Sequence, residues 1–325
     1  MPIPKHLQPQ GSNRWIWDDP RQAYVRLHLQ GNVLSGRVAG IPNLVAEIGA
    51  WGQEQGWQVY LEAHPFADVQ PGFAVVAETL VDAWVDPELG FHEANRATQV
   101  RWGTGIRVCE VREEWVWGHL LDDGYGAWIP KTGVTDQVRE QIIRRQQAAQ
   151  RIVSKSGWVG DRWLWAGTAI PLVGDFPAVE QAAQHFPDPL PCTPETVVAQ
   201  ARRFLPGGDE AVTAYLWGGT AGSRLDCSGF VQTVARLCGR VLPRDADQQA
   251  TICQLGAWER AAPGDLVFFG EDGQGITHVG MALGGGEVIH CSRFHNGVRI
   301  DNLRDPQTDY AQQLRRMVWS SGRWF

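Results

Sequence analysis

The chain has 325 residues, of which 43% are hydrophobic and 20% are charged, so it can bury a sizeable core in about two or three domains. Its formal net charge is −7 and it contains no block of basic residues, which disfavours a nucleic-acid or anionic-membrane partner. Its six cysteines lie far apart without CxxC spacing, a pattern typical of reduced thiols rather than of a disulfide framework.

The beginning of the chain bears on its location. The first twenty residues lack the apolar core of an export signal, and no apolar run is long enough to span a membrane. We therefore expect a cytoplasmic protein without a membrane partner.

Residues 1–70 are predicted to form a small α+β unit. Apolar and polar residues alternate over 14–30 around a DDP turn, which indicates strand, turn and strand. Residues 41–56 have helical spacing, with a proline near the start and a glycine at the end, and 57–64 return as a strand. We identify no chemistry in this unit.

The middle of the chain is predicted to be rich in β structure. Short strands separated by glycine-containing turns favour a small SH3-like barrel over 71–134. Residues 135–150 are polar and helix-like, and 156–173 resemble part of a second β unit. We therefore expect a second, abbreviated SH3-like domain over 135–190.

Residues 191–325 are predicted to form the last domain. Thr193 is a plausible N-cap, with Pro194 at the first helical position, for a helix over 194–205. Short strands with glycine turns follow a cysteine-bearing segment. This order favours an α+β fold in which helices pack on an antiparallel sheet.

The segment "LDCSGFVQTVARLC" places Cys227 where a helix is expected to begin. Apolar residues recur at helical intervals from Phe230 onward. The first N–H groups of a helix lack internal partners and carry partial positive charge, so we expect them to lower the thiol pKa from about 8.5 into the range of roughly 3.5–7.5. Gly229 is expected to leave space for a substrate backbone.

Two histidines could supply the base that such a nucleophile needs. His278 lies early in one predicted strand, and His290 ends the next. If these strands form a hairpin turning at 284–286, His278 lies opposite Cys291 and the two imidazoles are neighbours. One ring could then orient the other, as the third member of a catalytic triad does.

The residues alone leave three interpretations of this group open. The thiol and imidazoles could be catalytic, or Cys227 could be an ordinary packed cysteine. A zinc site made from one cysteine and two histidines is the third, although the long, irregular separations differ from common zinc signatures.

The motifs of the last domain together resemble a known family. "YLWGG", "LDCSGFVQ", "LPRDADQQA", "PGDLVFF" and "THVGMALGGGEVIHCS" occur in the order found in NlpC-type cell-wall cysteine peptidases, over roughly 194–325. That family has a papain-like catalytic domain. With upstream units resembling bacterial SH3-like modules, the chain is similar to the γ-D-glutamyl-L-diamino acid endopeptidases of the dipeptidyl-peptidase VI type.

The resemblance implies roles for individual residues. Cys227 is the expected nucleophile, His278 the base, and His290 the residue that orients the base. Tyr215 is expected beside the oxyanion, and Asp226, which from the residues alone could equally be a simple helix cap, is expected to bind the free amine of the substrate's L-Ala. The remaining expected substrate-binding residues are Ser228, Trp217, Tyr125, Arg244 and Asp245.

The resemblance also implies an activity. We expect hydrolysis of the γ-D-Glu–diamino acid bond of peptidoglycan peptides with a free N-terminal L-Ala, releasing L-Ala-γ-D-Glu during cell-wall recycling. No cofactor, metal, nucleic acid or obligate protein partner is expected. Two alternatives stay open: an amidase or acyltransferase using the same Cys-His-His site, and a non-catalytic cell-wall-binding protein.

Overall fold

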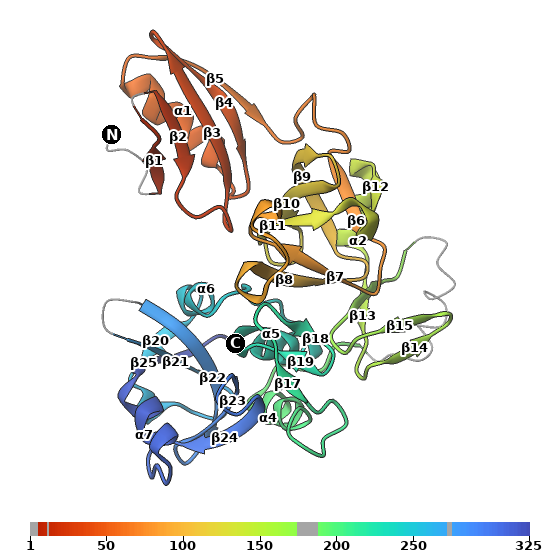
Figure 1. Ribbon diagram of the computed structural model, residues 1–325, viewed down its shortest axis with the longest axis vertical. Helices are drawn as coiled ribbons and strands as arrows, with labels where there is room; N and C mark the ends of the chain where they lie inside the picture. Colours follow the sequence, from red (N-terminus) through yellow and green to blue (C-terminus); the bar gives the residue numbers. More distant parts are fainter. Residues whose placement is uncertain (1–5, 12, 174–187, 272–274) are drawn as a thin grey trace.

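The computed structural model describes residues 6–11, 13–173, 188–271 and 275–325 (Figure 1). Along the chain, a five-stranded sheet is followed by a seven-stranded sheet, two two-stranded sheets, a three-stranded sheet and a six-stranded sheet with helices beside it. The predicted α+β class is confirmed. The division into units at residues 70, 134 and 190 stays a prediction.

The N-terminal unit is a five-stranded sheet with one helix. The strand order is β1-β2-β3-β4-β5, and β4 and β5 are parallel because α1 connects them. Buried apolar residues such as Trp15, Leu34 and Trp51 form a core between sheet and helix. The elements are β1 (Leu7–Pro9), β2 (Arg14–Trp17), β3 (Tyr24–Gln30), β4 (Val33–Ala39), α1 (Leu44–Glu54) and β5 (Gln58–Ala63).

The second unit, called the barrel unit after the predicted SH3-like domain, is an antiparallel seven-stranded sheet around its own apolar core. Its strand order is β12-β6-β9-β10-β11-β7-β8, and Val76, Ile106 and Ile129 are among its fully buried residues. The last strand continues to Gln137, three residues past the predicted end of this unit. The strands are β6 (Phe73–Val76), β7 (Leu80–Trp84), β8 (Arg96–Arg101), β9 (Gly105–Arg112), β10 (Trp115–Leu120), β11 (Gly126–Pro130) and β12 (Val134–Gln137), with short helices at Pro87–Leu89, Glu93–Asn95 and Lys131–Gly133.

A short segment of small elements connects this sheet to the last domain. Its helix, α2, lies within the polar stretch that was predicted to be helical. Residues 174–187 of the predicted second SH3-like unit lie outside the described residues. The elements are α2 (Arg139–Gln147), β13 (Gln150–Ile152), β14 (Gly157–Val159), β15 (Arg162–Leu164) and β16 (Ala169–Pro171), paired as β13 with β16 and β14 with β15.

The last domain packs α5 against an antiparallel sheet of order β20-β25-β21-β22-β23-β24 (Figure 1). Phe230 and Val234 of α5 share a core with Met281 and Ile289 of the sheet. Thr193 caps α4 as predicted, because its hydroxyl accepts the backbone N–H of Thr196. The helices are α4 (Pro194–Arg202), α5 (Cys227–Leu237), α6 (Ala246–Thr251), a short helix at Trp258–Arg260 and α7 (Asp309–Arg316). The strands are β17 (Ala214–Tyr215), β18 (Thr220–Ala221), β19 (Arg224–Leu225), β20 (Gln254–Gly256), β21 (Leu266–Glu271), β22 (Gly275–Gly284), β23 (Glu287–Ser292), β24 (Gly297–Asn302) and β25 (Val318–Arg323).

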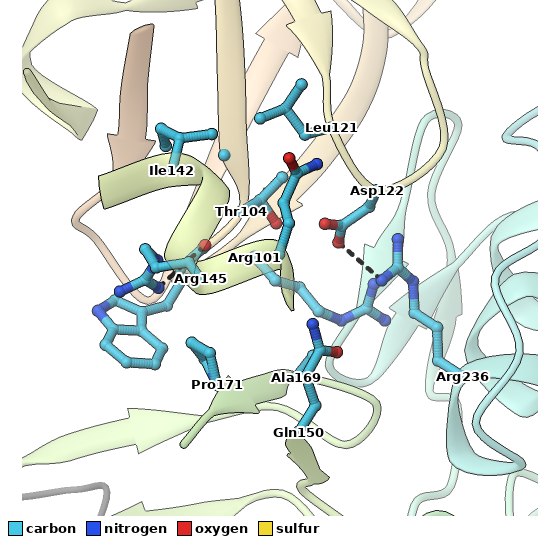
Figure 2. Close-up of a pocket in the computed structure, with 14 residues that line it drawn as sticks. Arg101, Thr104, Leu121, Asp122, Ile142, Arg145, Gln150, Ala169, Pro171 and Arg236 are labelled. Carbon is cyan, nitrogen blue, oxygen red and sulfur yellow. Dashed lines mark hydrogen bonds and ion pairs between the residues drawn. The ribbon is translucent and has the colours of Figure 1, made fainter. Parts of the chain in front are cut away.

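Polar contacts fix the barrel unit onto α5. Figure 2 shows the cavity at this junction, where Arg236 of α5 donates to Asp122 at 2.9 Å. Arg101 of β8 donates to the carbonyl of Thr220 and to the hydroxyl of Thr233 on α5. The helix that begins with Cys227 is therefore held from both the sheet and the barrel.

Candidate active site

Cys227 is the first residue of α5, as the sequence predicted. Asp226 caps the helix by accepting the backbone N–H of Gly229 at 2.7 Å. A Cβ atom on Gly229 would lie 2.0 Å from the carbonyl oxygen of Gly219. The space expected for a substrate backbone is thus filled by the protein's own chain, and the glycine lets the helix start pack closely there.

The electrostatic expectation for Cys227 is wrong in direction. Its side chain is almost fully buried, and burial, followed by the adjacent Asp226 carboxylate, raises the pKa of Cys227 to about 12. Backbone N–H groups of Val279 and Ser228 act in the opposite direction but are outweighed. At neutral pH the resting side chain is a thiol, so a base has to remove its proton before it can attack.

His278 on β22 is suited to be that base. Its Nε2 lies 2.8 Å from Nδ1 of His290, and Nε2 of His290 lies 2.9 Å from Asp301. Burial, and then the neighbouring His290, lower the pKa of His278 well below its ordinary value. The ring is therefore neutral at physiological pH and able to accept a proton.

The hydrogen-bond chain determines which ring nitrogen accepts that proton. Burial opposes ionisation of Asp301, but hydrogen bonds from His290 and His295 hold the pKa of Asp301 below its usual value, so it is an acceptor. His290 must then donate through Nε2 and accept at Nδ1. It follows that His278 donates through Nε2, and its Nδ1 is left unprotonated. The backbone N–H of Val279, the next residue, lies near enough to the Cys227 sulfur to lower the pKa of the thiol, so His278 is one residue along the chain from a group beside the thiol.

The strand register places these imidazoles together, although it differs from the predicted one. Met281 pairs with Ile289 and Ala282 with Val288, a shift of one residue. Gly280 rather than His278 therefore lies beside His290, and a Cβ atom there would be 2.9 Å from the Cβ atom of His290. His278 and His290 occupy the same face as diagonal neighbours, whereas the predicted register would have placed them on opposite faces.

Sequence reasoning missed the groups behind His290. Asp301 on β24 accepts from both His290 and His295, at 2.9 and 2.8 Å. The pairing of β23 with β24 explains the contact, because His290 pairs with Arg299 and Asp301 is two residues further on the same face. That register is not readable from the sequence.

These contacts also bear on the zinc interpretation. Nε2 of His278 and Nδ1 of His290 contact each other directly, so an ion could not lie between them. The ligand atoms of His290, His295 and Asp301 lie within 4.8 Å of one another, and hydrogen bonds account for that grouping. The geometry favours a relay of hydrogen bonds over a metal centre.

A cavity of about 370 Å³ lies beside the thiol. Most of the predicted substrate-binding residues meet there, whereas Arg244 does not line it. The predicted residues that line the cavity with Cys227 are Tyr125, Tyr215, Trp217, Asp226, Ser228 and Asp245.

Asp226 and Arg244 form a buried ion pair rather than two separate ligand-binding groups. Arg244, 1% exposed, donates to Asp226 at 2.6 and 3.2 Å and to the hydroxyl of Ser228 at 2.8 Å. Asp226 also accepts the backbone N–H groups of Gly218 and Gly229. These donors already contact both oxygens of Asp226, so Arg244 supports a residue of the cavity without lining the cavity itself, and binding of a substrate amine by Asp226 stays a prediction.

The two aromatic residues of the "YLWGG" motif lie at the rim and wall of the cavity. Tyr215 is partly buried, and burial, followed by the proximity of Cys227, raises the pKa of its hydroxyl. Trp217 is about half exposed. These positions allow Tyr215 to donate near the thiol and Trp217 to contact a bound peptide.

The far end of the cavity is acidic and is assembled from three parts of the chain. Tyr125 of the barrel unit donates its hydroxyl to Asp245 at 3.0 Å. Arg21 of the N-terminal unit, which sequence reasoning missed, donates to Asp245 at 2.7 Å and to Asp247 at 2.9 Å. Burial raises the pKa of Asp245, while Arg244 and Arg21 oppose that effect.

Family profiles match two segments of the chain. The NlpC/P60 family profile covers residues 212–317, which include the thiol, both histidines and Asp301. The profile of the bacterial dipeptidyl-peptidase Sh3 domain covers residues 91–134, which include Tyr125. A gamma-D-glutamyl-L-lysine dipeptidyl-peptidase of Bacillus cereus is 39% identical over 270 residues, covering 70% of this chain and 78% of that protein.

The chain belongs to the NlpC/P60 family. The predicted resemblance and the predicted class, a cysteine peptidase, are thereby confirmed. Other relatives match over shorter segments. A gamma-D-glutamyl-L-lysine dipeptidyl-peptidase of Bacillus subtilis is 39% identical over 102 residues, or 31% of this chain and 34% of that protein. A probable endopeptidase p60 of Listeria seeligeri is 38% identical over 107 residues, or 33% of this chain and 19% of that protein, so the chain spans about a third or less of these two relatives.

A solved structure agrees with this assignment at the level of fold. An NlpC/P60 family protein from Bacillus cereus superposes with a TM-score of 0.62 and 18% identity, covering 78% of this chain and 99% of that one. None of the helices in the described parts of the chain is long and apolar enough to cross a membrane.

Proposed function

We propose that this NlpC/P60 protein hydrolyses the γ-D-Glu–diamino acid bond of peptidoglycan peptides and releases L-Ala-γ-D-Glu. The observation that carries the proposal is the relay from Asp301 through His290 and His278, beside a buried thiol at one end of a cavity whose other end is acidic. The names of two relatives, gamma-D-glutamyl-L-lysine dipeptidyl-peptidases, support the same bond type.

The first half of the proposed reaction transfers the acyl group to sulfur. Nδ1 of His278 takes the thiol proton, and the thiolate attacks the γ-carbonyl carbon of D-Glu. The tetrahedral oxyanion is stabilised by the backbone N–H of Cys227 and the hydroxyl of Tyr215. His278 then gives its proton to the nitrogen of the departing diamino acid, and the C–N bond breaks.

The second half returns the free enzyme. Water loses a proton to His278 and attacks the thioester, and the C–S bond breaks as the thiolate takes the proton back. L-Ala-γ-D-Glu leaves with its new carboxylate. His290 and Asp301 hold the tautomer of His278 throughout and stabilise its transient positive charge.

The acidic end of the cavity is proposed to bind the free L-Ala amine. Asp245 and Asp247 both line the cavity, and Asp245 is oriented by the Tyr125 hydroxyl. An ammonium group compensates carboxylates that burial otherwise penalises. Asp245 therefore takes the role that the sequence assigned to Asp226, and peptides with a blocked amine are poor substrates.

The biological setting is part of the same proposal. A requirement for a free L-Ala amine fits short peptides released from the wall better than intact, sugar-linked wall. Recycling of such fragments in the cytoplasm is therefore proposed. Cell fractionation with an antibody against the protein tests the location, and recovery of the protein outside the cytoplasm would contradict it.

The activity is tested with the peptide L-Ala-γ-D-Glu-L-Lys and its diaminopimelate counterpart. Wild-type protein is expected to release L-Ala-γ-D-Glu, identified by mass, whereas Cys227→Ala releases none. Cys192→Ala, which removes a thiol outside the cavity, should keep wild-type activity. Equal hydrolysis by the wild type and Cys227→Ala would contradict the proposal. Products formed by hydrolysis of a different amide bond, or by acyl transfer to an acceptor other than water, would favour the amidase or acyltransferase alternative.

A further inference from the structure

The turn between β2 and β3 brings the N-terminal unit onto the barrel loop that carries Tyr125. Gly126 donates its backbone N–H to the carbonyl of Arg21 at 2.9 Å. A Cβ atom on Gly126 would lie 2.4 Å from the carbonyl oxygen of Pro20, so this close approach requires glycine. The turn is therefore held against the residue next to a cavity-lining tyrosine.

The side chain of Arg21 extends from this turn to the beginning of α6. Its guanidinium donates to Asp245 at 2.7 Å and to Asp247 at 2.9 Å. Asp19 of the same turn accepts from Nε and Nη2, at 2.8 Å each, and so fixes the plane of the guanidinium. A guanidinium that donates to several carboxylates is oriented more firmly than one in an isolated ion pair on the surface. Arg21 also lines the cavity that contains Cys227.

Arg21 and Tyr125 act on the same oxygen of Asp245. Both donate to its Oδ2, one from the N-terminal unit and the other from the barrel. The two donors thereby restrict the rotation of the carboxylate. Three carboxylates, of Asp19, Asp245 and Asp247, accept from this one guanidinium, so Arg21 does not neutralise all of them, and Asp245 and Asp247 in the cavity can still attract an ammonium group.

We propose that Arg21 is a specificity-determining residue that the N-terminal unit supplies to the substrate cavity. It orients Asp245 for the substrate ammonium and closes the cavity beyond that ammonium to peptides extended at the amine. This inference rests on the proposed function. Arg21 precedes both segments matched by family profiles, residues 91–134 and 212–317, so the inference gives residues 1–70 a role that family membership does not assign.

The test compares Arg21→Ala with the wild type on two peptides, L-Ala-γ-D-Glu-L-Lys and the same peptide acetylated at its amine. For the free-amine peptide, kcat/KM is expected to fall about 10–100-fold, mainly through a higher KM, because Asp245 loses one of its orienting donors. The ratio of kcat/KM between free and acetylated peptide should fall by about 10-fold or more. The rate at which iodoacetamide alkylates Cys227 should stay unchanged, because the chemistry lies at the other end of the cavity.

Two further variants separate the effect from general damage. Arg14→Ala removes an exposed arginine from β2 of the same unit and should retain the wild-type ratio. Asp19→Asn keeps Arg21 but weakens the contacts that orient its guanidinium, so the ratio of kcat/KM between free and acetylated peptide should fall by a smaller factor. This variant replaces Arg21→Ala in the test if Arg21→Ala fails to fold.

The outcomes distinguish this inference from the proposed function. A folded Arg21→Ala or Asp19→Asn protein with the wild-type ratio would overturn the role of Arg21 while the peptidase proposal stands. A wild-type protein that cleaves neither peptide would overturn both.

Discussion

The two ends of the substrate cavity are built in different ways. The reactive end takes Cys227, His278, His290 and Asp301 from one domain, and three of these four side chains are almost fully buried. The acidic end is assembled from three units through Arg21, Tyr125 and Asp245. The residues of the proposed chemistry thus come from one contiguous domain, whereas the proposed recognition of the amine depends on how separate units dock.

Removing the base should have the largest effect on the reactive end. In His278→Ala no imidazole can take the proton of a thiol whose pKa is raised to about 12, so kcat/KM should fall by roughly 10³–10⁴. Steady-state kinetics on the free-amine peptide measures this loss. His28→Ala, which removes an exposed histidine of β3, is the matched control and should match the wild type. A His278→Ala protein within a few-fold of wild type would show that the relay does not activate the thiol.

Breaking the buried ion pair between Arg244 and Asp226 should lower the stability of the folded protein. In Arg244→Met the Asp226 carboxylate stays buried without its cation, which should lower the free energy of unfolding by about 3–5 kcal/mol. Urea denaturation measures this change. Arg112→Met removes an arginine from an exposed pair with Glu88 and should cost less than about 1 kcal/mol. Equal destabilisation by the two variants would contradict a structural role for the buried pair.

The residue behind the histidines should have a smaller effect on rate. Asp301→Asn replaces an acceptor by an amide that can donate to His290 and so favour the wrong tautomer, and kcat/KM should fall about 10–100-fold. Loss of the negative charge also makes an imidazolium less stable. The acid limb of the pH profile of kcat/KM should therefore move to lower pH. A purely structural role for Asp301 would lower activity without moving that limb.

The smallest effect concerns a buried histidine of the barrel unit, the unit that carries Tyr125. Burial lowers the pKa of His119 on β10 to about 3, whereas the same imidazole in the unfolded chain has a pKa of about 6.5. Between these values the unfolded state binds the additional proton, so stability is lost as pH falls, by about 1.4 kcal/mol per pH unit for this group. Urea midpoints of the wild type and His119→Leu at pH 7, 6 and 5 measure it. The variant should show the shallower dependence, and parallel curves would contradict the assignment.

The features of the reactive end that depend on local sequence were predictable, and those that depend on packing were not. The start of α5 at Cys227 follows from local spacing, and the hairpin that brings His278 near His290 follows from motif order, although its register is shifted by one residue from the predicted one. The prediction of a lowered thiol pKa was wrong because burial raises the pKa of Cys227 more than the helix N-terminus lowers it. That burial depends on how α5 packs against the sheet and the barrel.

The residues proposed to recognise the amine were less predictable for a related reason. Asp226 and Arg244 are eighteen residues apart, and no local pattern indicates that they neutralise each other. Arg21 and Asp245 are separated by 224 residues, and their contact exists only because the β2–β3 turn docks on the barrel. Pairings across units therefore had to come from the structure.

The most direct test of the whole account is the dependence of hydrolysis on the substrate amine. Wild-type protein should cleave L-Ala-γ-D-Glu-L-Lys with a kcat/KM at least about 100-fold higher than its N-acetylated form, because acetylation removes the charge that the acidic end binds. Equal values of kcat/KM for the two peptides would contradict the claim that one cavity joins thiol chemistry at one end to amine recognition at the other.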